Sequence, residues 1–403
     1  MILKNKQHLI FFIFIAFGLF IYYASYQIKK PLIIEKAAIW VPRFDYQSAD
    51  DIKKILKNIN DVGFTDVFFQ IRGNGTVFYP SKIEPWAHDL HNGDINSLGL
   101  DPGWNPLQLI LDEADQYNIN VHAYINVLPG WKGKSKPKAG IGQSWADHPD
   151  WFMVDANGNI MQPTTGWYTF LNPAHPEVIN HLSLLINEII EYDVKGIHLD
   201  YIRYPYDYLF VVNEVYPSVS KENLKSYADF SYDIHTYSNV INFSRIKNKT
   251  NRIKAKSHII SSLVEDFNKI IKTHNPNLIL SASVLGNLYD AELHAGQAPQ
   301  DWLKNNSIDW VIQMNYGKNN FRSNAKAYQK RFTKKQRNNN WIIGITADQS
   351  LRNIKSQFTS LSSYKCKGVA IFSYGLLFEN HRFTLKSKLI KNLLDEYLIS
   401  NFN

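Results

Sequence analysis

The sequence predicts an α/β protein with the fold of a (β/α)8 TIM barrel, preceded by one apolar segment at its amino terminus. Short segments rich in β-branched and aromatic residues recur without strict alternation, which is typical of parallel strands buried on both faces. Helical patterns lie between them, and each strand ends in a polar or aromatic cluster. The expected strands are Ala37–Val41, Val67–Ile71, Val121–Asn126, Gly196–Tyr201, Leu278–Val284, Asp309–Met314, Trp341–Ile345 and Gly368–Phe372.

Four helical patterns between these strands are clear, at Ala49–Val62, Pro106–Tyr117, Pro176–Tyr192 and Ala255–His274. A doubly wound open sheet is the alternative fold. It would need a glycine loop for phosphate after the first strand, and residues 42–45 (PRFD) contain no glycine. The barrel is therefore the preferred prediction.

Two connections are much longer than the few residues usual between elements. One follows the second strand, from Gly73 to about Asn105, and the other follows the fourth, from Tyr204 to about Lys254. Both leave the carboxyl ends of strands, where barrel enzymes place their active sites. We expect them to form the walls of a cleft.

Composition limits the classes of protein to consider. With 403 residues, 45% hydrophobic and 20% charged, the chain can bury a large core and is not disordered as a whole. Its net charge of +8 favours anionic partners but is modest for this length. Basic residues are spread out, so we do not expect nucleic-acid binding. The single cysteine, Cys366, cannot form an intramolecular disulfide.

Residues 1–30 are predicted to be a signal anchor or a signal peptide. Residues 9–24 (LIFFIFIAFGLFIYYA) are uncharged and apolar, with lysines on both sides. No small-x-small cleavage motif ends this run, because Tyr22 stands two positions before Ala24, which favours an uncleaved anchor. We therefore expect residues 31–403 to form a barrel domain in the cell envelope, on the periplasmic or extracytoplasmic face of the inner membrane. The expected partners are the membrane, through this helix, and a substrate, with no obligate protein partner.

The segment 196–205 (GIHLDYIRYP) carries the clearest candidate for catalysis. Asp200 stands at the carboxyl end of the strand, and His198 lies on the same face two residues earlier. Arg203, Tyr201 and Tyr204 are expected to supply donors that keep Asp200 ionised. A nucleophile or a stabiliser of an oxocarbenium ion requires that ionised form. The alternative is an Asp200–Arg203 pair that only holds the loop.

Other strand ends carry amides, hydroxyls and a cation, which suit a hydroxyl-rich ligand. For His122 and Gln313 the alternative is a satisfied polar group inside the barrel. Arg72 would need an anion or a carboxylate, because an unpaired buried arginine is costly. Six of the ten tryptophans, Trp86 among them, lie in the region after the second and third strands and could stack on sugars. The predicted substrate-binding residues are Arg72, Asn74, Trp86, His122, Tyr124, Asn126, His198, Tyr201, Arg203, Gln313, Asn315 and Tyr316.

Several other chemistries lack their signatures. The first strand has no His-x-His of a metal amidohydrolase, and no Gly-x-Ser-x-Gly or dinucleotide fingerprint is present. His88 and His91 lie in a loop without a clear partner for a metal. The sequence therefore predicts no metal site and no cofactor.

A further set of short segments is distinctive in combination. They are 69–75 (FQIRGNG), 79–81 (YPS), 84–86 (EPW), 122–126 (HAYIN), 148–151 (HPDW), 172–173 (NP), 198–205 (HLDYIRYP), 296–297 (GQ), 302–303 (WL), 309–316 (DWVIQMNY) and 368–375 (GVAIFSYG). Taken together, these motifs resemble the glycosyl-hydrolase-like 10 family across about residues 36–390. The resemblance implies a (β/α)8 glycoside hydrolase of the bacterial envelope that cuts peptidoglycan glycan strands stripped of their peptides. It maps Asp200 onto the catalytic aspartate and Arg72, Asn126, Gln313 and Tyr316 onto the cleft lining. The chain lacks the lipobox cysteine of some members.

Glycoside hydrolysis usually needs a second carboxylate. Glu292 is the first candidate and Asp290 the second, because both follow the fifth strand on the expected face; Glu84, Asp348 and Glu379 are further candidates in loops. The predicted function is hydrolysis of an N-acetylated amino-sugar polymer, with denuded peptidoglycan first. The alternatives are hydrolysis of an exported biofilm polysaccharide and a non-catalytic carbohydrate-binding barrel.

Overall fold

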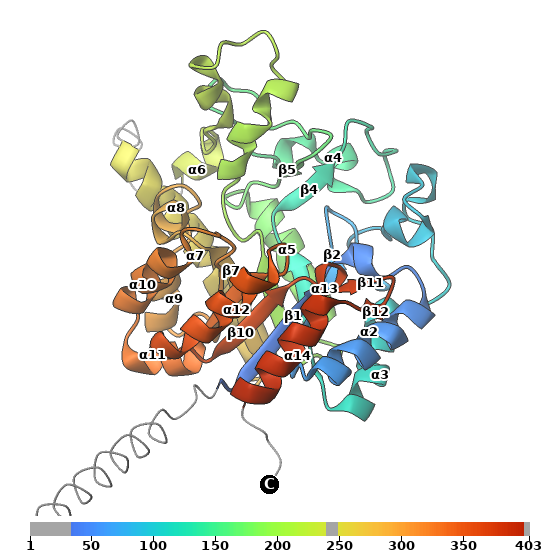
Figure 1. Ribbon diagram of the computed structural model, residues 1–403. Coiled ribbons are helices and arrows are strands. Elements are labelled where there is room, and N and C mark those ends of the chain that lie inside the picture. Colours follow the sequence, from blue (N-terminus) through green and yellow to red (C-terminus); the bar gives the residue numbers. More distant parts are fainter. Residues whose placement is uncertain (1–33, 239–248, 399–403) are drawn as a thin grey trace, which may run out of the picture.

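The computed structural model describes residues 34–238 and 249–398, and its centre is a closed barrel of eight parallel strands (Figure 1). Each strand pairs with the next one along the chain, and β1 closes the barrel on β10, with Lys36 opposite Gly368. The predicted strands are confirmed within one residue at either end. They are β1 (Lys36–Val41), β2 (Asp66–Arg72), β3 (Asn120–Asn126), β6 (Gly196–Asp200), β7 (Ile279–Leu285), β8 (Trp310–Met314), β9 (Trp341–Thr346) and β10 (Gly368–Phe372).

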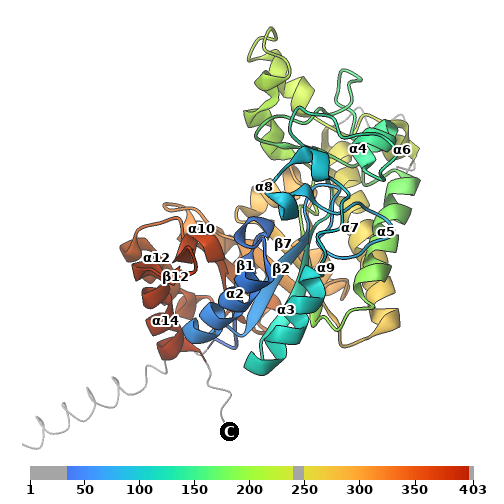
Figure 2. The same ribbon diagram turned by 90° about the vertical axis from the view of Figure 1, so that its right-hand side faces the viewer.

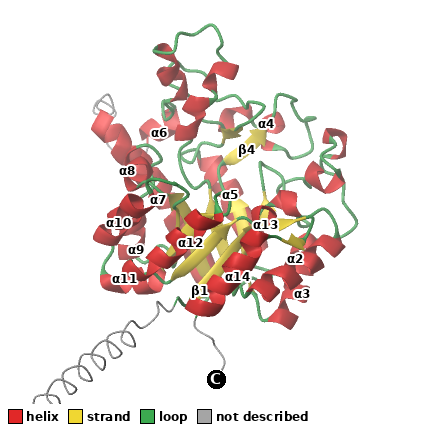
Figure 3. Cartoon of the chain, in the orientation of Figure 1, coloured by secondary structure: helices red, strands yellow, loops and turns green. Residues whose placement is uncertain are grey.

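Helices enclose the strands, as Figure 3 shows in red around yellow. Helix α2 (Ala49–Val62) begins with a capping box between Ser48 and Asp51 and ends at Gly63, whose φ of 96° suits glycine. The fourth predicted helix starts earlier than expected, at Lys249 instead of Ala255. The other helices are α3 (Pro106–Ala114), α4 (Ser144–Asp147), α5 (Pro176–Ile189), α6 (Ile234–Ser238), α7 (Lys249–His274), α8 (Leu288–Leu293), α9 (Pro299–Lys304), α10 (Phe321–Arg331), α11 (Lys334–Asn340), α12 (Leu351–Ser360), α13 (Tyr374–Leu377) and α14 (Leu385–Tyr397).

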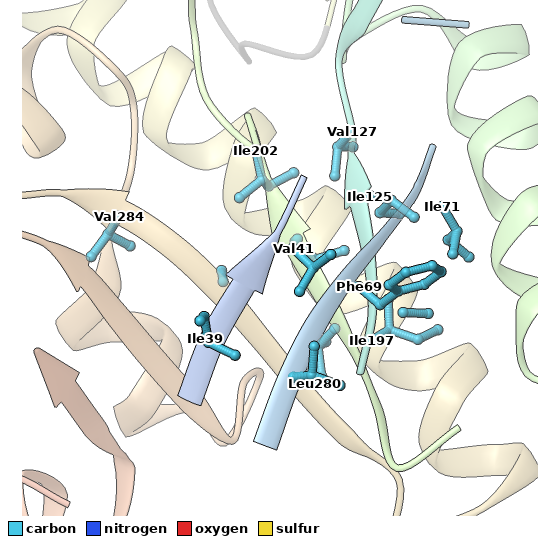
Figure 4. Close-up of a cluster of buried hydrophobic side chains, with 14 of the residues drawn as sticks. Ile39, Val41, Phe69, Ile71, Ile125, Val127, Ile197, Ile202, Leu280 and Val284 are labelled. Atoms are coloured by element: carbon cyan, nitrogen blue, oxygen red, sulfur yellow. The ribbon is translucent and has the colours of Figure 1, made fainter. Parts of the chain in front are cut away.

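Both faces of the barrel strands are buried, which explains why the strands read as nearly continuous apolar runs. Side chains such as Trp40, Phe68 and Ile312 fill the interior in one cluster. The alternate side chains face the helices and belong to a second, larger cluster, part of which Figure 4 shows around Ile39, Phe69 and Leu280. The barrel is therefore a packed core, and only its ends are available for a ligand.

Three long connections leave the carboxyl ends of strands. The two predicted ones follow β2 and β6. A third, at residues 127–175 after β3, was not predicted and carries a small antiparallel hairpin of β4 (Pro129–Lys132) and β5 (Tyr168–Phe170). Figures 1 and 2 show the connections after β3 and β6 projecting from one end of the barrel. Near the other end, Ile34 donates its N–H to the carbonyl of Tyr397 over 2.9 Å.

The predicted anchor, residues 1–30, lies outside the described residues. Within the described ranges, no helix is both long enough and apolar enough to cross a bilayer.

Candidate active site

A cavity of about 410 Å³ lies at the carboxyl end of the barrel strands, which we call the mouth cavity. Its walls come from the ends of β1, β2, β3 and β10, from β5 of the hairpin, and from the residue after β6. Sites in barrel enzymes are built from such strand ends. Its lining residues include Arg43, Asp45, Tyr124, Asn126, Tyr168, Tyr201 and Phe372.

Asp200 ends β6 beside this cavity and is nearly buried. The hydroxyl of Tyr124 donates to its Oδ2 over 3.0 Å, and the backbone N–H of Tyr201 donates to its Oδ1 over 2.7 Å. Tyr201 adopts a left-handed φ of 51°, an uncommon conformation for a residue other than glycine. Two residues predicted for the site, Tyr124 through its hydroxyl and Tyr201 through its backbone N–H, thus bind Asp200 and also line the mouth cavity.

The expectation that Arg203 keeps Asp200 ionised is wrong. Arg203 places its Nη2 2.9 Å from Oδ2 of Asp207 instead. Burial raises the pKa of Asp200 above its ordinary value, and Arg203, the Tyr201 N–H and the Tyr124 hydroxyl oppose this only in part. A raised pKa favours the protonated carboxyl group, which is the form that acts as a general acid.

Asp45 is the carboxyl group among the residues that line the mouth cavity, and the sequence analysis did not select it. It lies just after β1, in the turn at Arg43–Asp45. Burial raises its pKa to about 7, although the N–H of Gly375 donates to its Oδ2 over 3.2 Å. A side chain at position 375 would meet this carboxylate, because an ideal Cβ there lies 2.5 Å from Oδ1 of Asp45. Its signal in the sequence was its place directly after a barrel strand.

Arg43 is the cation that lines the mouth cavity. Its N–H donates to Oε1 of Gln70 over 3.0 Å, and its Nη2 donates to the hydroxyl of Tyr168 over 3.4 Å. Asp89 lies 3.6 Å from its Nε. The sequence analysis also missed this residue, because the role of the cation was given to Arg72.

Arg72 is fully buried and is part of the framework below the cavity. Its Nε and Nη2 donate to the two carboxylate oxygens of Glu84 over 2.8 and 2.6 Å, and its Nη1 donates to the carbonyls of Asn126 and Val127. His181 adds a hydrogen bond to Glu84 over 3.0 Å. The carboxylate that a buried arginine needs is therefore Glu84, so the structure does not place Arg72 against a substrate.

Neither candidate for the second carboxylate lines the mouth cavity. Both Glu292 and Asp290 lie on the short helix α8. Glu292 forms a partly exposed ion pair with Arg331 over 2.9 Å, and Asp290 lines a different cavity, beside Tyr206. The prediction of their position at the mouth is wrong because the chain turns into α8, away from the barrel axis, soon after β7 ends.

Tyr316 follows β8 and lies close to Asp200. Its ring is 5.4 Å from that of Phe372, and the charge of Asp200 helps to raise its pKa well above the ordinary value, after burial. Its buried hydroxyl has no hydrogen-bond partner among the described residues, and the same holds for Oδ1 of Asn126. Asn126 therefore brings an unpaired polar atom to the lining of the mouth cavity, and Tyr316 brings one close to Asp200.

The other predicted polar residues support the fold. His122 binds Asp66 over 3.0 Å, which is the alternative considered for it. His198 lies in the interior, where it accepts from Nε1 of Trp40 over 3.0 Å and where burial lowers its pKa well below the ordinary value. Gln313 donates its side-chain N–H to the carbonyl of Gly286, and Asn315 donates its own to the carbonyl of Phe321. The backbone carbonyl of the buried Asn74 accepts from the side chain of Gln143.

The tryptophans after the second and third strands pack the long connections against the core. Trp131 and Trp151 are buried, and Trp86, Trp104, Trp145 and Trp167 are partly buried against the hydrophobic cluster. None of these six is among the residues that line the mouth cavity. Within residues 34–238 and 249–398, no three His, Cys, Asp or Glu side chains come together as metal ligands would.

A model of the glycosyl hydrolase-like 10 family matches residues 36–364. The chain belongs to this family. This confirms the resemblance carried by the sequence motifs. Glycosyl hydrolase YngK of Bacillus subtilis is 23% identical over 353 residues, which are 80% of this chain and 62% of that protein. Glycosyl hydrolase DigH of Escherichia coli is 32% identical over 158 residues, which are 36% of this chain and 32% of that protein. The chain thus aligns with about a third of DigH and somewhat under two thirds of YngK.

Solved structures share the barrel. The glycoside hydrolase domain of PgaB (BpsB) from Bordetella bronchiseptica has a TM-score of 0.61 at 12% identity, over 91% of this chain and 100% of that one. The catalytic domain of β-amylase from Paenibacillus polymyxa has a TM-score of 0.58 at 10% identity, over 90% and 98% of the two chains. At these identities the likeness shows the fold alone.

Proposed function

We propose that this protein is a glycoside hydrolase of N-acetylated amino-sugar polymers, with denuded peptidoglycan glycan strands as its substrate. Membership of the glycosyl hydrolase-like 10 family supports the reaction class. The observation that carries the proposal is the placement of Asp200 at the mouth of the barrel, hydrogen-bonded to Tyr124 and with a raised pKa.

In this proposal Asp200 is the general acid that protonates the oxygen of the scissile glycosidic bond. Burial raises its pKa above the ordinary value, which is the direction that the acid of a glycosidase requires. The ionised form that remains after proton transfer accepts from the Tyr124 hydroxyl and the Tyr201 N–H, so the charge that develops there is stabilised.

Asp45 is the second carboxyl group of the proposed mechanism. It shares the mouth cavity with Tyr124 and Tyr201, the two residues that bind Asp200. With a pKa of about 7, a substantial fraction of Asp45 is ionised at neutral pH and can accept a proton from an attacking water. The two carboxyl groups would then act as acid and base on one bond.

The choice of substrate rests on a cation at the cavity and on the expected location. Murein glycans carry lactyl carboxylates, and Arg43 at the mouth cavity and the net charge of +8 would attract them. We propose that residues 9–24 anchor the protein in the membrane, so that the barrel lies in the cell envelope near this polymer. The positive charge of Arg203 acts on Asp200 and lowers its pKa in part.

The test is to incubate the full-length protein with peptide-free murein glycan strands and, separately, with poly-N-acetylglucosamine, and to identify released fragments by mass spectrometry. Asp200→Asn should fold and release nothing measurable, whereas Asp150→Asn, at an exposed surface position, should keep wild-type activity. Cleavage of poly-N-acetylglucosamine alone would assign a biofilm polysaccharide instead. Full activity of Asp200→Asn would remove Asp200 from the mechanism.

A further inference from the structure

A second cavity, of about 440 Å³, is lined by the connection after β6, by α7 and by α8. We call it the α8 cavity. Neither the sequence analysis nor the proposed mechanism gives it a role. Its walls include Tyr206 and Leu209 from the connection, Phe230 further along, Lys256 of α7, and Asp290 and His294 from α8 and its end.

Aromatic and apolar side chains are exposed at this cavity. The rings of Tyr206 and His294 are stacked, with centroids 6.3 Å apart and planes 20° from parallel. Tyr289 lies beside His294, with ring centroids 5.7 Å apart in an edge-to-face arrangement, and is 62% exposed. Leu209 and its neighbour Phe210 are 40% and 76% exposed. Exposed and partly exposed aromatic rings are suited to stack on the apolar faces of sugars.

Three cationic side chains, Lys225, Arg252 and Lys256, and two carboxylates, Asp229 and Asp290, line the α8 cavity. Nζ of Lys256 donates to Oδ1 of Asp229 over 3.1 Å and lies 5.2 Å from the ring of Tyr204. Arg252 lies 3.9 Å from the other oxygen of Asp229. The carboxylate of Asp290 and the phenol of Tyr206, whose pKa burial raises to about 12, remain as groups that can bind neutral hydroxyls or amides.

The α8 cavity adjoins the mouth through Arg203. The guanidinium of Arg203 lies 4.8 Å from the ring of Tyr201, which lines the mouth cavity, and 6.0 Å from the ring of Tyr206, which lines the α8 cavity. Its Nε and Nη1 are buried and have no hydrogen-bond partner among the described residues. One buried arginine with donors to spare therefore stands between the two cavities.

We propose that the α8 cavity is a second glycan-binding subsite, which holds neighbouring sugar units of the same polysaccharide chain whose bond is cut at the mouth. This inference rests on the proposed function and deepens it, because it makes the substrate an extended chain of pyranose units. Tyr206 and His294 stack on a sugar ring, and Asp290 accepts from its hydroxyl or amide groups. Arg203, whose guanidinium lies between the rings of Tyr201 and Tyr206, connects the walls of the two cavities.

The test compares Tyr206→Ala/His294→Ala with wild type on glycan chains of graded length. The double variant should lose at least about tenfold in kcat/KM on long chains and keep wild-type kcat/KM on the shortest chain that is cleaved, because each lost stacking contact removes binding energy only where a sugar reaches it. Tyr206→Phe should keep most of the activity on long chains. Tyr216→Ala, an aromatic of the same connection that packs on Tyr227 away from the cavity, is the matched control. An equal loss on all lengths, or no loss, would overturn the subsite.

A binding measurement separates this inference from the proposed function. In affinity electrophoresis with glycan in the gel, Asp200→Asn should be retarded, and addition of Tyr206→Ala/His294→Ala should abolish most of that retardation. If wild type binds glycan through these residues and cleaves none, the subsite stands and the proposed reaction fails. If wild type and Asp200→Asn both bind no glycan, the subsite is wrong.

Discussion

Replacing Arg72 by methionine tests whether this arginine supports the barrel or binds the substrate. In the structure Arg72 neutralises the fully buried carboxylate of Glu84, whose pKa is lowered from 4.5 to about 2. A shift of about 2.5 units corresponds to roughly 3 kcal/mol of folding free energy at neutral pH. Breaking a buried ion pair by removing one partner typically costs about 3 to 5 kcal/mol. We therefore expect Arg72→Met to lower the Tm by roughly 3 to 6 °C.

The pH dependence of this loss follows from the lowered pKa. Because the pKa of Glu84 is lower in the folded than in the unfolded protein, its stabilisation is complete above the unfolded value of 4.5. It is lost as the pH falls through the folded value of about 2. The difference in Tm between wild type and Arg72→Met should therefore be largest above about pH 5 and shrink in acid.

Thermal denaturation between pH 3 and pH 8 measures this effect. Arg331→Met is the matched control, because its ion pair with Glu292 is 44% and 32% exposed and should be worth about 1 kcal/mol or less. Arg72→Met/Glu84→Gln should recover part of the loss, since it removes the uncompensated charge. Wild-type stability of Arg72→Met together with a large rise in KM would refute the structural role and restore Arg72 to the substrate site.

Two further predictions concern the mouth carboxyl groups. Tyr124→Phe removes a hydrogen bond that favours ionised Asp200, so the pKa of Asp200 should rise further and the alkaline limb of the kcat/KM profile should move to higher pH; an unchanged limb would separate that limb from Asp200. Asp45→Asn should raise the Tm by a few degrees at pH 8 and leave it unchanged at pH 4. The reason is that burial raises the pKa of Asp45 from 3.8 to about 7, so the ionised carboxylate destabilises the folded protein above pH 7 and the protonated group does not at pH 4. Equal Tm values for Asp45→Asn and wild type at pH 8 would contradict this.

Much of the fold could be predicted because it depends on local patterns. The eight strands are short apolar segments between helical periods, and each was found within one residue of its bounds. The third long connection was missed, because β4 and β5 are only four and three residues long and have no pattern of their own. Asp200 and Tyr124 could be selected because side chains alternate between the two faces of a strand. The even-numbered side chains of β3 and β6 therefore share one face.

The sequence by itself determined that the chain is a barrel of this family, with Asp200 at the carboxyl end of a strand, since periodicity and motif spacing are properties of neighbouring residues. Only the tertiary structure decided which charges meet. It paired Arg72 with Glu84, turned Arg203 toward Asp207, directed Glu292 to Arg331, and brought Asp45 to the mouth beside Gly375, 330 positions away. Those choices depend on how each connection folds back and packs against its neighbours, and the burial and pKa of each group follow from that packing.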